Sequence, residues 1–140
     1  MFGKPLSCVL LADRHHGLSE GVRGLLATLF ETVVMVADEK SLLEAAGRLR
    51  PDVAIVDLSL AHAADLGWLR ALRAAGPGLG VIVVSVHDEA SVRRAAIDAG
   101  ADAFVLKRAI ATDLLHAVES LRRRRSAAAP VSGAPGAGQP

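Results

Sequence analysis

Short apolar runs alternate along this chain with segments in which apolar residues recur every three or four positions. Five of the runs are rich in valine and isoleucine and show no apolar-polar alternation, which is typical of strands buried on both faces of a parallel sheet. They lie at residues 8–12, 33–37, 53–56, 81–84 and 103–106. The pattern therefore predicts a parallel sheet that is covered by helices on both sides.

Five apolar stripes with helical spacing follow these runs in turn. They are Leu18, Val22, Leu25, Leu26 and Leu29; Leu42, Leu43, Ala46 and Leu49; Leu66, Leu69 and Leu72; Val92, Ala95, Ala96 and Ala99; and Leu114, Leu115, Val118 and Leu121. Five strand and helix pairs in strict order predict an α/β fold with right-handed crossovers and a doubly wound sheet.

The residues expected at helix ends agree with this order. Ser41 and Glu44 have the spacing of a capping box, and Asp88 is a candidate N-cap. Pro51 is expected to close the second helix, and Gly100 to end the fourth helix in a left-handed conformation. After Arg125 the chain is rich in Ala, Pro and Gly without periodicity, so we expect a domain at residues 1–125 and a disordered tail at 126–140.

Composition and charge exclude several classes of protein. The 140 residues are enough for one domain, and an apolar fraction of 51% with only 3% aromatic residues requires an aliphatic core. The formal charge is +1, but the chain outside Arg122–Arg125 has 12 basic against 15 acidic residues. A body with that balance is not expected to bind nucleic acid directly.

Disulfides, thiolate metal sites and membrane spans are not expected either. Cys8 is the single cysteine, and none of the five histidines has the spacing of a metal-ligand pair. No apolar stretch approaches the roughly 20 residues needed to cross a bilayer. Residues 1–5 contain one lysine with no long apolar region behind it, so we expect no secretory signal and a cytoplasmic protein.

Four polar residues each follow one of the apolar runs: Asp13, Asp57, Ser85 and Lys107. Carboxyl ends of parallel strands meet at one edge, where open α/β sheets bind ligands. Two acids, a hydroxyl and a lysine can together hold a metal ion and a phosphoryl group. A single aspartate at the end of a strand more often serves as a turn residue or a helix cap. Only the coincidence of all four polar residues at strand ends favours a functional site.

The residues around these four resemble the receiver domain of bacterial response regulators, of the LuxR/NarL type usually joined to a C-terminal helix-turn-helix. The resemblance covers residues 7–121. Its motifs are Val-Leu-Leu-Ala-Asp at 9–13, Pro-Asp-Val-Ala-Ile-Val-Asp-Leu at 51–58, Val-Ser at 84–85 and Ala-Gly-Ala-Asp-Ala-Phe-Val-Leu-Lys at 99–107. It implies a flavodoxin-like fold with strand order 2-1-3-4-5 and a role in two-component signalling rather than an enzyme.

The resemblance also implies a role for each site residue. Asp57 would accept the phosphoryl group, and Asp13, Asp57 and the carbonyl of Ser59 would hold Mg²⁺, which prefers hard oxygen ligands. Lys107 would pair with the phosphoryl group, and the hydroxyl of Ser85 would donate a hydrogen bond to it.

An aromatic switch and a partner face are implied as well. Phe104 matches the aromatic residue that moves inward when the hydroxyl is drawn to the phosphoryl group. The face built from the fourth helix, the fifth strand and the fifth helix would then carry partner contacts. Because that face is expected to offer Val92, Ala96, Phe104 and Leu106, we expect a weak homodimer there.

The chain departs from the family in the acidic pocket. Arg14 stands where the family has the acid that is the principal ligand of Mg²⁺. The exchange of an acid for an arginine changes the local charge by two units, so an arginine that points inward would compete with a dication. A bidentate hydrogen bond from its guanidinium to Asp57 or Asp13 would occupy the position of the metal ion. Ala61 and Asp65 replace the usual proline and glycine of the following loop.

Four functions are consistent with these residues. The first is a single-domain receiver that takes a phosphoryl group from a histidine kinase or phosphotransfer protein and relays the signal to a downstream protein. The second is a degenerate receiver that binds its partner without phosphorylation because of Arg14, with Mg²⁺ binding weak or lost. The third is a flavodoxin-like enzyme or flavin carrier, although residues 13–19 lack a phosphate cradle. The fourth, a DNA-binding regulator, requires a longer parent chain.

Overall fold

A parallel sheet forms the centre of the protein in the computed structural model, which describes residues 6–14, 16–60 and 66–133. Its strands within the described residues are β1 (Leu6–Ala12), β2 (Phe30–Val36), β3 (Val53–Asp57), β4 (Gly80–Ser85) and β5 (Ala103–Leu106). They pair in parallel in the order β2-β1-β3-β4-β5. The predicted flavodoxin-like topology and strand order are confirmed.

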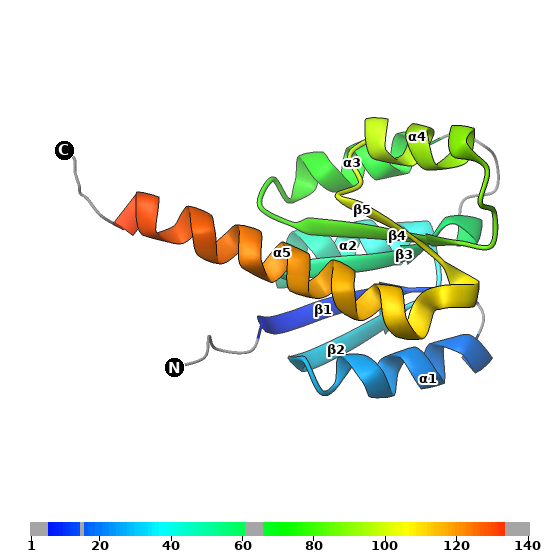
Figure 1. Ribbon diagram of the computed structural model, residues 1–140, viewed down its shortest axis with the longest axis horizontal. Coiled ribbons are helices and arrows are strands. Elements are labelled where there is room, and N and C mark those ends of the chain that lie inside the picture. The colour runs from blue at the N-terminus through cyan, green and yellow to red at the C-terminus, as the bar shows by residue number, and fades with distance from the viewer. Residues whose placement is uncertain (1–5, 15, 61–65, 134–140) are drawn as a thin grey trace.

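Helices cover both faces of this sheet (Figure 1). They are α1 (His16–Leu26), α2 (Glu39–Leu49), α3 (Gly67–Ala75), α4 (Ala90–Asp98) and α5 (Ile110–Gly133), with short 3₁₀ turns η1 (Leu58–Leu60) and η2 (Lys107–Ala109). Buried residues of α2, α3 and α4 pack in one cluster and those of α1 and α5 in another. The sheet is thus the middle layer of three.

Alternate residues of each central strand enter the two clusters. In β3, Ala54 and Val56 pack toward α2, α3 and α4, whereas Val53 and Ile55 pack toward α1 and α5. All four of these side chains are fully buried. This explains why the strands read as continuous apolar runs, since neither face meets water.

Two of the predicted caps are wrong. The N-cap of α2 is Asp38, whose carboxylate accepts a hydrogen bond from the N–H of Ser41 at 2.7 Å, so Ser41 lies inside the helix. Asp38 lies three residues before Ser41, and its carboxylate binds a backbone N–H in the first turn of the helix, so the helix begins earlier than predicted. The N-cap of α4 is Glu89 and not Asp88, because the Asp88 carboxylate pairs instead with Arg108 at 3.0 Å.

The two predicted helix ends are correct. Helix α2 ends at Leu49, just before Pro51, and Arg50 between them adopts a left-handed conformation with φ of 51°. Gly100 follows α4 with φ of 124°, a conformation that side chains with a Cβ rarely adopt. Its carbonyl can therefore turn toward α3.

Helix α5 is longer than the sequence predicts. It continues through residues 126–133, which we expected to be disordered, while 134–140 lie outside the described residues. Ala127–Ala129 explain the extension because alanine has the highest helix propensity. Figure 1 shows these last turns projecting beyond the sheet. In the part of the chain described here, no helix combines the length and apolar character needed to cross a membrane.

Candidate phosphoryl-acceptor site

The four predicted residues come together at the carboxyl edge of the sheet. Asp13 and Asp57 directly follow the paired residues Ala12 and Val56 of β1 and β3. Ser85 ends β4 opposite Leu106 of β5, which Lys107 follows. Among the described residues, the buried polar ones are Asp13, Asp57 and Ser85, with 8%, 4% and 2% of their surface exposed. The burial of polar groups is therefore concentrated at this one edge.

Asp57 is held at both carboxylate oxygens. Lys107 Nζ donates to Oδ2, and the backbone N–H of Ser59 donates to Oδ1 at 2.9 Å. Burial beside Ile55, Val84 and other apolar residues raises the pKa of Asp57. The hydrogen bonds from Lys107 and Ser59, and one with Asp13, act more strongly together, so the pKa lies below its ordinary value of 3.8. Asp57 is thus a rigid anion at neutral pH.

Arg14 reaches from the end of β1 to the loop that follows Asp57. Its Nη1 donates to the carbonyl oxygen of Ser59 at 3.1 Å. The sequence leaves open a fork from Arg14 to Asp57 or Asp13, but the hydrogen bond described for Arg14 goes to this carbonyl. A carbonyl at the surface of a 3₁₀ turn accepts a hydrogen bond at little desolvation cost, whereas Asp57 is already bonded to Lys107 and Ser59.

The side chains and the carbonyl at this site, in their present arrangement, do not form a binding site for a divalent cation. Two carboxylates and the Ser59 carbonyl are the expected oxygen ligands, and Arg14 already binds that carbonyl. No group of three or more His, Cys, Asp and Glu residues suited to a metal occurs within the described ranges. Two cationic side chains, Arg14 and Lys107, contact Ser59 and Asp57 instead, and together they carry the charge of one dication.

Ser85 lies beside the ion pair of Asp57 and Lys107, and its side chain holds the loop after β4. Its Oγ accepts a hydrogen bond from the N–H of His87 at 2.9 Å. The same hydroxyl keeps its own hydrogen as a donor. Asp88 of this loop pairs with Arg108 of η2, and both side chains are largely exposed. Arg108 was not among the residues predicted from the sequence. The one signal for it in the sequence is its position next to Lys107.

The predicted switch residue Phe104 is buried, with 7% of its surface exposed. It packs among the residues under α4, and the Arg93 guanidinium carbon lies 5.0 Å from the centre of its ring. Ala96 is fully buried in the same cluster. The expectation that Phe104 and Ala96 lie on the partner face is therefore wrong, because Phe104 of β5 and Ala96 of α4 both pack into the core between that strand and that helix. Val92 and Leu106 are partly exposed there.

Two predicted departures from the family cannot be placed, since Ala61 and Asp65 lie outside the described residues.

The sequence matches the profile of the response regulator receiver domain over residues 9–119. The chain belongs to this family. Its members are signalling domains of two-component systems rather than classical enzymes, and they generally bind Mg²⁺ at the acidic pocket.

Relatives and solved structures point to the same LuxR/NarL-type receivers. The nitrate/nitrite response regulator protein NarP of Escherichia coli K12 is 36% identical over 114 residues, which are 80% of this chain and 53% of NarP. The signal receiver domain of NarL from Mycobacterium tuberculosis has a TM-score of 0.74 and 27% identity, over 84% of this chain and 96% of that one.

A structure of RcsB from Salmonella enterica serovar Typhimurium, bound to promoter rprA in the presence of phosphomimetic BeF₃⁻, has a TM-score of 0.73 and 25% identity. The match covers 83% of this chain and 98% of that one. The chain spans about half the length of the curated relatives it matches.

Proposed function

We propose that this receiver accepts a phosphoryl group on Asp57 from a histidine kinase or phosphotransfer protein and relays the signal to a downstream protein. The observation that carries the proposal is the state of Asp57: a buried carboxylate, kept anionic by Lys107, at the end of the central strand. A nucleophile needs a free electron pair and a fixed direction, and both are available here.

The residues beside Asp57 provide contacts for the product. Lys107 would move from the carboxylate to the phosphoryl oxygens as a point charge. The Ser85 hydroxyl would donate to the same group and exchange its present bond with the His87 N–H, which would shift the loop at residues 86–89. That loop leads into α4, so the change would reach the face of α4, β5 and α5.

We expect the partner at this face to be a protein rather than nucleic acid, because the body outside Arg122–Arg125 carries more acidic than basic residues. A weak homodimer through the same face and a cytoplasmic location are further predictions. The partly exposed Val92 and Leu106 would form the apolar part of the contact.

A degenerate receiver is the second candidate function, and the contact between Arg14 and Ser59 favours it. The guanidinium binds a carbonyl that the family resemblance assigns to the metal. A receiver fixed in this way would bind its partner without phosphorylation.

Intact mass after incubation with acetyl phosphate tests the proposal. We expect one added phosphoryl group on the native chain and none on Asp57→Asn, whose nearly isosteric amide is not a nucleophile. Label that persists in Asp57→Asn would contradict the assignment of Asp57. A native chain that takes no label under any condition, from acetyl phosphate or from a kinase, would instead support the degenerate receiver.

A further inference from the structure

Arg14 and the proposed acceptor Asp57 are bonded to the same residue, Ser59. Arg14 donates to the carbonyl oxygen of Ser59, and the N–H of Ser59 donates to the carboxylate of Asp57. One residue of η1 therefore joins the arginine to the acceptor. Arg14 is exposed, so its side chain can move toward a group that arrives from solvent.

Phosphoryl transfer to a carboxylate brings a group with several negative charges against an anion. Catalysis of such transfers consists largely of positioning and of stabilising the charge on the phosphoryl oxygens. Lys107 carries a single positive charge, which is paired with Asp57 before the group arrives, so it cannot balance both the carboxylate and the phosphoryl oxygens. A second positive charge is needed, and the expected metal ligands do not fit a dication as they are arranged.

We propose that Arg14 supplies this second charge from within the chain, so that Asp57 accepts a phosphoryl group without a divalent cation. The proposal rests on the proposed function of Asp57. An Asp57 carboxylate oxygen forms the bond to phosphorus while the bond between phosphorus and the leaving oxygen of acetyl phosphate breaks. Acetate departs with the electron pair, and no proton, oxidant or reductant is required.

The shape of the arginine side chain suits this role. A guanidinium has five N–H donors in one plane, and one of them is used in the hydrogen bond described to Ser59. The other donors can pair with two phosphoryl oxygens at once, which a lysine ammonium cannot do in the same fixed geometry. Arg14 can thus bind the loop of the acceptor and the incoming group together.

Acetyl phosphate labelling in EDTA and in Mg²⁺ tests the role of Arg14, with BeF₃⁻ binding followed by ¹⁹F NMR as a second readout. We expect the native chain to be labelled equally in both conditions. Arg14→Met should lower the metal-free rate by at least about tenfold, which is less than the roughly hundredfold loss for a buried donor to a developing charge because Arg14 is exposed. Arg14→Lys should recover part of the rate, since it keeps the charge and loses the fork.

Arg14→Asp should reverse the metal dependence, with labelling in Mg²⁺ and none in EDTA, because a third carboxylate restores a ligand and removes the competing charge. The control is Arg70→Asp on the exposed face of α3, which changes the net charge equally and should behave as the native chain does. If Arg14 had only a structural role, its replacement would not change the dependence of labelling on Mg²⁺.

Four results would overturn the proposal. Native labelling that requires Mg²⁺, or equal metal-free labelling of Arg14→Met, would leave Asp57 as the acceptor and remove Arg14 from the reaction. No native label, with label on Arg14→Asp in Mg²⁺, would identify Arg14 as the cause of a degenerate receiver. No label on any variant in either condition would reject the proposed function itself.

Discussion

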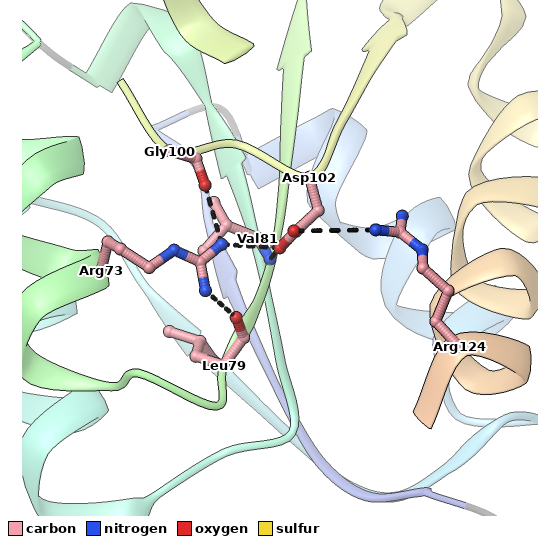
Figure 2. A network of polar contacts seen from close by, with 6 residues as sticks. All are labelled: Arg73, Leu79, Val81, Gly100, Asp102 and Arg124. Atoms are coloured by element: carbon pink, nitrogen blue, oxygen red, sulfur yellow. Dashed lines mark hydrogen bonds and ion pairs between the residues drawn. The ribbon is translucent and has the colours of Figure 1, made fainter. Parts of the chain in front are cut away.

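The two ends of the parallel sheet carry the same kinds of charged side chain and use them differently. At the carboxyl end, Asp57 and Lys107 form an ion pair beside Arg14. At the amino end, Arg73 and Asp102 form another, within a network that we call the amino-end clamp (Figure 2). The clamp consists of Arg73, Leu79, Val81, Gly100, Asp102 and Arg124.

The amino-end clamp binds mainly backbone groups. Arg73 donates to the carbonyl of Leu79, to the carbonyl of Gly100 at 2.7 Å and to the carboxylate of Asp102 at 2.6 Å. The same carboxylate accepts the N–H of Val81 at 2.8 Å, and the N–H of Asp102 donates to the carbonyl of Val81 at 2.7 Å. One ion pair thus ties α3 to the starts of β4 and β5.

The carboxyl end keeps hydrogen-bond donors for an incoming group. The Ser85 hydroxyl retains its donor, and Arg14 is exposed with further N–H groups beyond the one on Ser59. The ion pair of the amino-end clamp is bonded to backbone groups and stabilises the fold. The ion pair at the carboxyl end lies beside further donors and a buried nucleophile, so it is suited to binding and reacting with a phosphoryl group. Substitutions at the two ends should therefore separate stability from labelling.

The largest effect on stability is expected for Arg73→Met. The substitution removes the charged partner of the Asp102 carboxylate and a hydrogen bond from each of two carbonyl groups, in a region only partly open to water. We expect a loss of about 2 kcal/mol in the free energy of unfolding, measured in urea. Arg70→Met on the same helix is the control and should change stability by less than about 0.5 kcal/mol. A loss for Arg73→Met as small as for Arg70→Met would show that the clamp does not stabilise the fold.

Asp57→Asn should have a smaller effect on stability and a complete effect on labelling. The substitution removes the ion pair with Lys107, but it also removes the cost of burying the carboxylate. The Lys107 side chain is 15% exposed and long enough to turn toward solvent, so we expect the free energy of unfolding at neutral pH to fall by about 1 kcal/mol or less. A loss equal to that of Arg73→Met would mean that the two ends are equally structural.

The pH dependence of stability should distinguish the native chain from Asp57→Asn. Because the pKa of Asp57 is lowered on folding, its ionised form stabilises the native state above the unfolded pKa, near 3.8, and this stability is lost as pH falls through the lower folded value. Urea unfolding between pH 6 and pH 3 should show a steeper loss for the native chain than for Asp57→Asn. Parallel profiles would argue that Asp57 has no favourable interaction in the folded state.

Arg124→Ala should have a smaller effect on stability than Arg73→Met or Asp57→Asn. Its guanidinium lies 3.9 Å from the Asp102 carboxylate and its side chain is 57% exposed. Exposed pairs of this kind contribute about 0.5 kcal/mol or less. A destabilisation in urea as large as that of Arg73→Met would show that α5 is anchored by the clamp rather than by its buried Leu114, Val118 and Leu121.

The sequence by itself determined the order of strands and helices, because its apolar runs and stripes have distinct periods. It also determined that Asp13, Asp57, Ser85 and Lys107 share one edge, since each follows a strand of the same parallel sheet. Pro51 and Gly100 marked helix ends correctly because their backbone restrictions are local.

Only the tertiary structure decided which group each long polar side chain contacts. Arg14 binds the carbonyl of a residue 45 positions away, and Asp88 pairs with Arg108 instead of capping α4. Phe104 and Ala96 lie in the core because β5 is covered by α4, and the amino-end clamp joins residues from α3, β4, α5 and the segments before β4 and β5. Periodicity places a side chain on a face, but its partner depends on which elements meet in space, and no local pattern in the chain encodes that meeting.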